Sequence, residues 1–142
     1  MADRSASRSS AFQLLHRAGQ RADSVFAREV GKTALTRSQF AVLLAVKRSS
    51  GGSQSAIVEA TGIDRSSTAA LVLRLVEKGW LQRRRTQSDK RVYAVRLTAT
   101  GASVLASAEP AATKTDGALL APLSASERSR FLEALERIVH NE

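Results

Sequence analysis

Residues 53–79 read SQSAIVEATGIDRSSTAALVLRLVEKG, and this stretch decides the fold. Ser53 can cap a short helix that Gly62 ends, because a serine side chain can accept from the free amides of a first helical turn. Asp64 can cap a second, longer helix that runs to the stop at Gly79. Two helices joined by a tight turn containing glycine are the outline of a helix-turn-helix.

Two short strands are expected directly after this motif, at 81–85 and 92–97. The polar segment 86–90 between them is typical of a hairpin. Val92, Ala94 and Leu97 are expected to carry the apolar side of the second strand. A basic hairpin that follows a helix-turn-helix is interpreted as a wing.

Helices are predicted on both sides of the winged motif. Apolar residues recur at helical spacing from Phe12 to about Val30, where Gly31 follows. Thr36-Arg-Ser-Gln39 and Ser124-Ala-Ser-Glu127 both fit the capping box that opens a helix. A further helix starts near Ala99 after the cap Thr98, and Pro110 could kink it.

The sequence therefore predicts a mainly α protein with a small β wing. Residues 1–10 carry no pattern and are expected to form a flexible arm, and residues 11–142 are expected to form one domain. Within it the winged helix-turn-helix covers about 36–98. The helices at about 11–31 and 99–140 remain for self-association, because their apolar faces exceed what one small winged lobe can cover.

The charge of the chain indicates a polyanionic partner. Its 22 Lys and Arg exceed its 13 Asp and Glu, which gives a net charge of +9. The excess lies in the middle of the chain, since residues 38–98 hold 11 basic and 4 acidic side chains. Such a concentration favours nucleic acid, and less often a membrane surface.

Other classes of function are disfavoured. The chain has no Cys, which excludes disulfides, thiolate metal sites and redox sensing through a thiol. Its two His are isolated, and no phosphate loop, nucleophile elbow or paired catalytic carboxylates occur, so no catalytic residue, metal site or cofactor is expected. No apolar run is long enough to span a bilayer, and a cytoplasmic protein is expected.

The segment from Asp64 to Gly101 resembles the MarR family of bacterial winged-helix regulators. The matching blocks are Asp64-Arg65-Ser66, Leu71-Val72-x-Arg74-Leu75, Lys78-Gly79-x-Leu81-x-Arg83-Arg84, Asp89-x-Arg91 and Leu97-Thr98-x-x-Gly101. Trp80 departs from the pattern, because a small aliphatic residue is common there. The resemblance implies a homodimer in which the first and last helices of both subunits interlock. It also implies repression of a neighbouring operon and release of DNA by a small, often aromatic or anionic, effector.

The start of the second helix of the motif should read the DNA. Arg65, Ser66, Ser67 and Ala70 are expected on its exposed side, with Arg74 further along. Small polar residues permit close entry into the major groove, where an Arg can bind both acceptors of a guanine. The alternative is that Ser66 and Ser67 only cap the helix.

Phosphate contacts are expected from the surrounding elements. On the wing we expect them from Arg84, Lys90 and above all Arg91, with Asp89 holding the hairpin tip in shape. Gln54 and Ser55 at one helix start, and Arg37 and Ser38 at another, could bind phosphate through backbone amides and hydroxyls. A merely solvated basic hairpin is the alternative for the wing.

His16 and Trp80 are candidate effector contacts, although an interface histidine and a packing tryptophan are the simpler interpretations. Two other functions stay open. One is an effector-independent DNA-binding or chromosome-organising protein, which no small molecule would release from DNA. The other is a winged helix that binds protein or RNA, which would show no salt-dependent preference for one duplex sequence.

Overall fold

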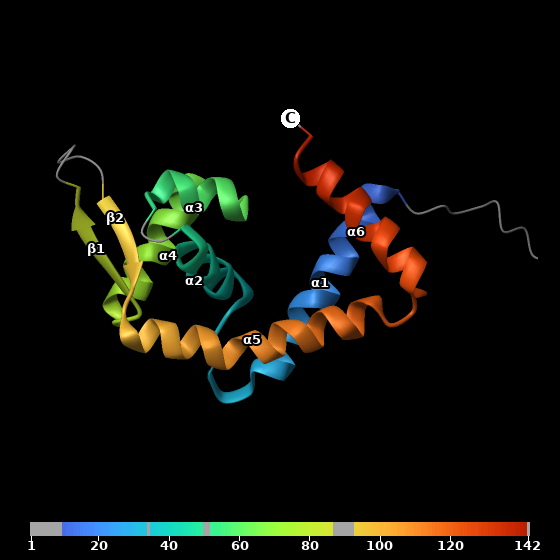
Figure 1. Ribbon diagram of the computed structural model, residues 1–142, viewed down its shortest axis with the longest axis horizontal. Helices are drawn as coiled ribbons and strands as arrows, with labels where there is room; N and C mark the ends of the chain where they lie inside the picture. The colour runs from blue at the N-terminus through green and yellow to red at the C-terminus, as the bar shows by residue number, and fades with distance from the viewer. Residues whose placement is uncertain (1–9, 34, 50–51, 87–92, 142) are drawn as a thin grey trace, which may run out of the picture. The chain divides into compact units, whose positions relative to one another are not determined.

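The computed structural model describes residues 10–33, 35–49, 52–86 and 93–141. Its elements are α1 (Ala11–Val30), the short 3-10 helix Gly31–Thr33, α2 (Arg37–Ser49), α3 (Gln54–Thr61), α4 (Arg65–Glu77), β1 (Leu81–Arg85), β2 (Tyr93–Leu97), α5 (Ala99–Leu120) and α6 (Ala125–Val139) (Figure 1). The expected fold class, mainly α with a small β wing, is confirmed. The expected arm at the N-terminus lies outside the described residues apart from Ser10.

The elements form two compact units. One, called here the winged lobe, comprises residues 30–111. The other contains α1 up to Glu29 and the chain from Ala112 onwards. Helix α5 runs without interruption through Pro110, so this proline does not end the helix.

Side-chain caps set the helix starts that the sequence predicted. The hydroxyl of Thr36 accepts from the amide of Gln39, and the Gln39 side chain accepts from the amide of Thr36, both at 3.1 Å. Ser124 and Glu127 form the same reciprocal pair at the start of α6, at 3.3 and 2.8 Å. Each pair satisfies amides that the first helical turn leaves without a carbonyl partner. These caps are local, which is why the sequence alone located them.

The turn between α3 and α4 depends on a glycine. Gly62 has a φ of 71°, in the left-handed region that other residues rarely adopt. Its amide donates to the carbonyl of Val58 at 2.8 Å and closes the end of α3. The chain then reaches Asp64, which caps α4.

One apolar core holds the winged lobe together. It contains Ile57 of α3 with Val72 and Leu75 of α4. The residues packed with them come from α2, the wing and α5: Val42, Leu43, Leu81, Val95, Leu105 and Ala108. The contacts between α3 and α4 are local in sequence, whereas the contacts of these helices with the wing and α5 join distant segments. The helix-turn-helix is therefore fixed against the root of the wing.

The wing strands pair antiparallel, with Leu81 opposite Leu97 and Arg85 opposite Tyr93. Val95 is fully buried, so the side of β2 that faces the core carries 93, 95 and 97. The expectation that Ala94 belongs to the same side as Leu97 was wrong, and Val92 lies outside the described residues. Ala94 is half-buried for a different reason, because it forms a bridge with Ser53 ahead of α3. The amide of Val95 donates to the carbonyl of Gly52 at 3.1 Å, so the segment ahead of α3 pairs with β2 as a short third segment.

The other unit leaves much apolar surface uncovered. Val25 and Phe26 of α1 are buried, but α6 has no buried residue among those described. Its exposed apolar side chains are Phe12, Leu14, Leu15, Phe131, Leu132, Ile138 and Val139. In the described part of the chain no helix is both long and apolar enough to cross a membrane.

Candidate nucleic-acid interface

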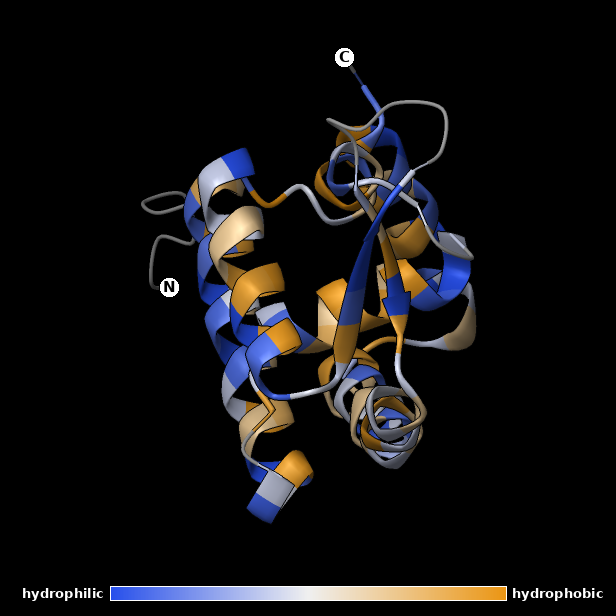
Figure 2. Cartoon of the chain, turned by 90° about the vertical axis from the view of Figure 1, so that its left-hand side faces the viewer, coloured by the Kyte–Doolittle hydropathy of each residue, from blue (hydrophilic) through white to orange (hydrophobic). Residues whose placement is uncertain are grey.

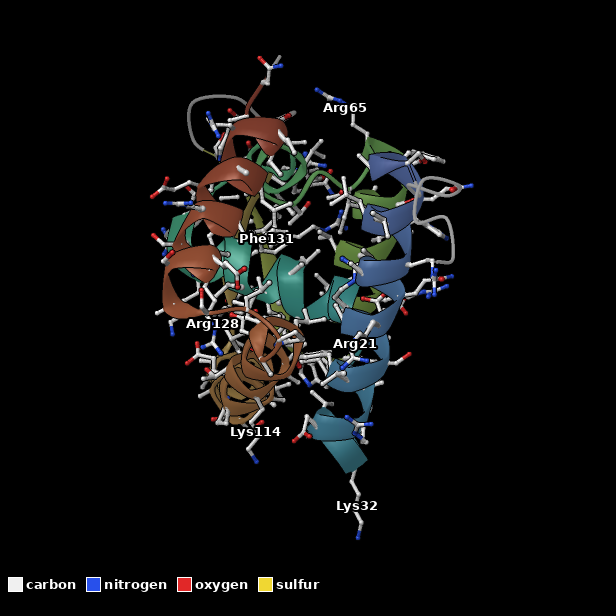
Figure 3. All side chains as sticks on the ribbon, turned by 90° about the vertical axis from the view of Figure 1, so that its right-hand side faces the viewer. Arg21, Lys32, Arg65, Lys114, Arg128 and Phe131 are labelled. Atoms are coloured by element: carbon white, nitrogen blue, oxygen red, sulfur yellow. The ribbon has the colours of Figure 1, made fainter. Side chains whose placement is uncertain are left out.

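The exposed face of α4 carries the residues that the sequence assigned to DNA reading. Arg65, Ser66, Ser67, Ala70 and Arg74 are all exposed, while Thr68, Val72 and Leu75 are buried in the winged lobe. Figure 3 shows the Arg65 side chain extending outward from the start of α4. The second helix of a helix-turn-helix is the one that enters the major groove. The structure thus brings these five residues onto one accessible surface.

Asp64 organises the start of this surface. Its carboxylate accepts from the amide of Ser67 at 2.8 Å and from the hydroxyls of Ser67 and Ser66 at 2.8 and 2.9 Å. These bonds, first that from the Ser67 amide and then those from the two hydroxyls, lower the pKa of Asp64 below its ordinary value. Because both hydroxyl protons serve the cap, the oxygens of Ser66 and Ser67 retain only lone pairs for another partner. The cap and a contact to a base donor are therefore compatible.

The wing adds a basic surface beside the helix-turn-helix. Figure 2 shows the hydrophilic run of β1 next to the more hydrophobic β2. Arg84 and Arg96 are exposed. A hollow on the wing is lined by Gln82, Arg84, Arg85, Thr86, Ala94 and Arg96. Three guanidinium groups around one hollow suit the binding of phosphate.

The ring of Tyr93 contacts two arginines of the wing, Arg83 and Arg85, the second of which also lines the hollow. The guanidinium carbon of Arg83 lies 5.0 Å from the centroid of the Tyr93 ring, and that of Arg85 lies 5.7 Å from it. Such distances are typical of cation–π contacts. Sequence reasoning missed this role, and the signal would have been the strand register, which sets Arg85 directly opposite Tyr93.

The remaining expected phosphate contacts lie at helix starts. Ser55 is exposed and Gln54 half-buried in the first turn of α3. Arg37 is exposed and Ser38 half-buried in the first turn of α2. The wing-tip residues Asp89, Lys90 and Arg91 lie outside the described residues.

The two candidate effector residues occupy different settings. His16 is exposed on α1, where it lines an open hollow with Phe12, Gln13 and Arg17. Trp80 is half-buried against the core of the winged lobe. Its indole lies under the ammonium of Lys78, which is 4.6 Å from the ring centroid. Trp80 therefore has a clear packing role at the base of the wing.

A close contact at the start of α5 fixes the wing root. Thr98 donates from its hydroxyl to the carbonyl of Gly79 at 2.5 Å and from its amide to the carbonyl of Trp80 at 3.1 Å. Gly101, whose amide donates to the Thr98 hydroxyl, packs so tightly on Trp80 that an added Cβ would overlap the Trp80 carbonyl. Thr98-x-x-Gly101 thus joins α5 to the turn that follows α4.

No group of three or more His, Asp or Glu side chains that could hold a metal ion occurs among the described residues.

Comparisons with known proteins agree with this architecture. A sequence model described as the MarR family matches residues 35–92. The transcriptional regulator HosA of Escherichia coli is 33% identical over 106 residues, which cover 75% of this chain and 78% of HosA. The transcriptional repressor NicR of Pseudomonas putida is 29% identical over 129 residues, which cover 91% of this chain and 82% of NicR.

A solved structure extends the similarity over most of the chain. BpsR of Bordetella bronchiseptica, whose DNA binding is regulated by 6-hydroxynicotinic acid, superposes with a TM-score of 0.83 at 28% identity. The match covers 89% of this chain and 96% of BpsR. With its helix-turn-helix, its two-stranded wing and these relatives, the chain belongs to the MarR family of winged-helix transcriptional regulators.

Proposed function

We propose that this protein is a homodimeric repressor that binds a specific sequence of double-stranded DNA. The observation that carries the proposal is the polar exposed face of α4, which begins at Arg65 and lies in the same lobe as the arginine-rich wing. The relative NicR is a transcriptional repressor, which supports repression as the direction of regulation. We infer no catalytic step, and a regulator of this kind would act in the cytoplasm, beside the chromosome.

The proposed complex places α4 in the major groove. Arg65 would donate to both acceptors of a guanine, and Ser66 and Ser67 would accept from a base amino group. Arg74, Arg84 and the first turns of α2 and α3 would hold the phosphates. The sequence adds Lys90 and Arg91 of the wing to this set, with Asp89 to pair with an arginine and hold the hairpin tip in shape.

The dimer would form through the helices outside the winged lobe. Phe131 of α6 (labelled in Figure 3), Ile138 and Val139 are exposed, as is Phe12 of α1. Exposed apolar side chains gathered on the terminal helices are typical of an association surface. Two lobes carried by one dimer would reach successive major grooves, about 34 to 36 Å apart.

An Arg65→Ala variant tests the proposed base reading. Its discrimination between a selected operator and a random duplex should fall by roughly 1 to 3 kcal/mol if Arg65 binds a guanine. Arg130→Ala, which removes an equal charge from an exposed position on α6, serves as the matched control and should leave the discrimination unchanged. A uniform loss of affinity for both DNAs in Arg65→Ala would contradict base reading by Arg65.

We further propose that a small aromatic carboxylate releases the repressor. The regulation of BpsR by 6-hydroxynicotinic acid supports this chemical class. The hollow on α1 offers His16, the guanidinium of Arg17 and the ring of Phe12 to such an anion, and Trp80 is a further candidate contact. Release would come from a change in the spacing of the two lobes, which weakens both half-sites together.

Calorimetry with 6-hydroxynicotinic acid as the probe tests this regulation. Thermodynamic reciprocity requires that operator DNA weaken binding of the effector by the same factor by which the effector weakens binding of DNA. The titration is done with and without operator duplex. Equal affinity in both conditions would exclude release by this molecule and favour an effector-independent regulator.

A further inference from the structure

Leu73 is an exposed leucine in the middle of the proposed DNA-reading surface. Its side chain is 45% exposed, although the neighbouring Val72 and Leu75 are fully buried in the core of the winged lobe. Leu73 follows Ser66 by seven residues, which is nearly two full helical turns, so the two side chains project from the same face of α4. Ala70 lies between them on this face and is also exposed. The centre of the surface is therefore apolar, while its start is polar.

The position of Leu73 separates it from the other large exposed apolar residues in the described part of the chain. Those other residues belong to α1 and α6, the helices to which we assign self-association. Leu73 instead lies in the winged lobe, next to the cation Arg74 and one turn before the acidic Glu77. A carboxylate is repelled by phosphates, so Glu77 limits how far the DNA contact extends along α4. Leu73 lies on the DNA side of that limit.

We propose that Leu73 is a specificity residue that contacts the C5-methyl group of a thymine in each half-site. The inference rests on the proposed binding of α4 in the major groove. The thymine methyl is the apolar group that base pairs present in that groove, and apolar side chains recognise it. Leu73 offers neither a hydrogen-bond donor nor an acceptor, so contact with a methyl group is the favourable interaction open to it on a base edge.

Helix geometry places this contact away from the one assigned to Arg65 and Ser66. Seven residues of an α-helix rise about 10 Å, which is close to the height of three stacked base pairs. Leu73 therefore meets a different base pair from the residues at the helix start. The half-site should combine a guanine near the Arg65 end with a thymine at a separate base pair.

The test replaces thymine by deoxyuridine, which removes the methyl group and keeps every hydrogen-bonding group of the base. A preferred duplex is first selected by the wild-type protein from a random library, and each thymine is then replaced in turn. Loss of one buried methyl should weaken wild-type binding about fourfold at one thymine of each half-site. Leu73→Ala should bind the unmodified duplex about fourfold more weakly and should be indifferent to the same replacement.

Two further variants separate a methyl contact from a structural effect. Leu73→Met keeps an apolar side chain of similar reach and should retain sensitivity to the methyl group, whereas Leu73→Asn has a similar shape but is polar and should lose it. Leu73→Ala and Leu73→Met should melt like the wild type, because Leu73 is outside the core and alanine and methionine are good helix formers. Leu73→Asn should melt slightly lower, because asparagine is a weaker helix former.

The outcomes distinguish this inference from the function on which it rests. If Leu73→Ala shows the same loss as the wild type at every replaced thymine, Leu73 does not contact a methyl group, and sequence-specific binding itself still stands. A selected half-site without thymine overturns the inference in the same way. If the wild type selects no preferred sequence at all, the proposed function fails, and the assignment of Leu73 fails with it.

Discussion

Replacing Gly101 by alanine should destabilise the winged lobe, because α5 approaches the turn after α4 too closely for a side chain. A Cβ at this position would overlap the carbonyl oxygen of Trp80 and lie 2.8 Å from its carbonyl carbon and 3.0 Å from its Cα. All three are backbone atoms, which cannot rotate away as a flexible side chain can. The start of α5 must therefore move away from the turn.

The expected cost follows from the contacts that such a shift disturbs. Overpacking in a close-packed region costs about 1 to 3 kcal/mol. Moving α5 also stretches the two hydrogen bonds from Thr98 to Gly79 and Trp80, each of which contributes about 0.5 to 1.5 kcal/mol. The higher helix propensity of alanine stabilises α5 by about 1 kcal/mol and offsets part of this cost. The free energy of unfolding should thus fall by about 3 kcal/mol, which lowers the melting temperature by roughly 10 °C.

Gly117→Ala is the matched control, because Gly117 lies in the same helix and has no atom within 4 Å of an added Cβ. This variant should be as stable as the wild type or more stable by up to about 1 kcal/mol. Both variants and the wild type are melted by circular dichroism at one protein concentration, since the stability of a dimer depends on concentration. Equal melting temperatures for Gly101→Ala and the wild type would refute the role assigned to this contact.

Four other predictions concern the interface and the dimer. Tyr93→Ala should weaken binding to operator and random DNA alike by freeing the two arginines that it orders, and Tyr93→Phe should not; a selective loss for operator alone would argue against this role. Arg91→Ala, a prediction from the sequence, should weaken operator binding in an electrophoretic shift without a change in melting temperature; unchanged affinity would remove it from the site. Asp64→Ala should lower the melting temperature at neutral pH. Because folding lowers the pKa of Asp64, the stabilisation by its cap is present above the ordinary value of 3.8 and is lost only as pH falls below it. The difference in melting temperature between the wild type and Asp64→Ala should therefore shrink below that pH. A difference that is constant with pH would contradict the assignment. Ile138→Glu should dissociate the dimer in sedimentation, because this side chain is 59% exposed in one chain; a variant that stays dimeric would place the interface elsewhere.

The surface of α4 could be predicted from the sequence only in part. The exposed start of α4 was predicted, because helical spacing assigns Ser66 and Ala70 to the side away from Val72 and Leu75, and Arg65 is the first residue after the cap Asp64. Leu73 was not assigned to the surface, since it lies in the run of apolar residues 69–73, in which leucines are usually buried. The capping role of Ser66 and Ser67 became visible only in the hydrogen bonds of their hydroxyls to the Asp64 carboxylate.

The helix starts and the helix-turn-helix could be predicted without the tertiary structure, because caps such as Thr36 with Gln39 and turns such as that at Gly62 depend on residues a few positions apart. The tertiary structure decided the face of each wing residue and the need for Gly101. Val95, and with it 93 and 97, faces the core because of the way β2 packs on the winged lobe, and strand alternation then puts Ala94 on the other side; Gly101 has no room for a side chain because α5 lies on Trp80. Both depend on segments distant in the chain, whose approach is set by the packing of the common core and not by local sequence.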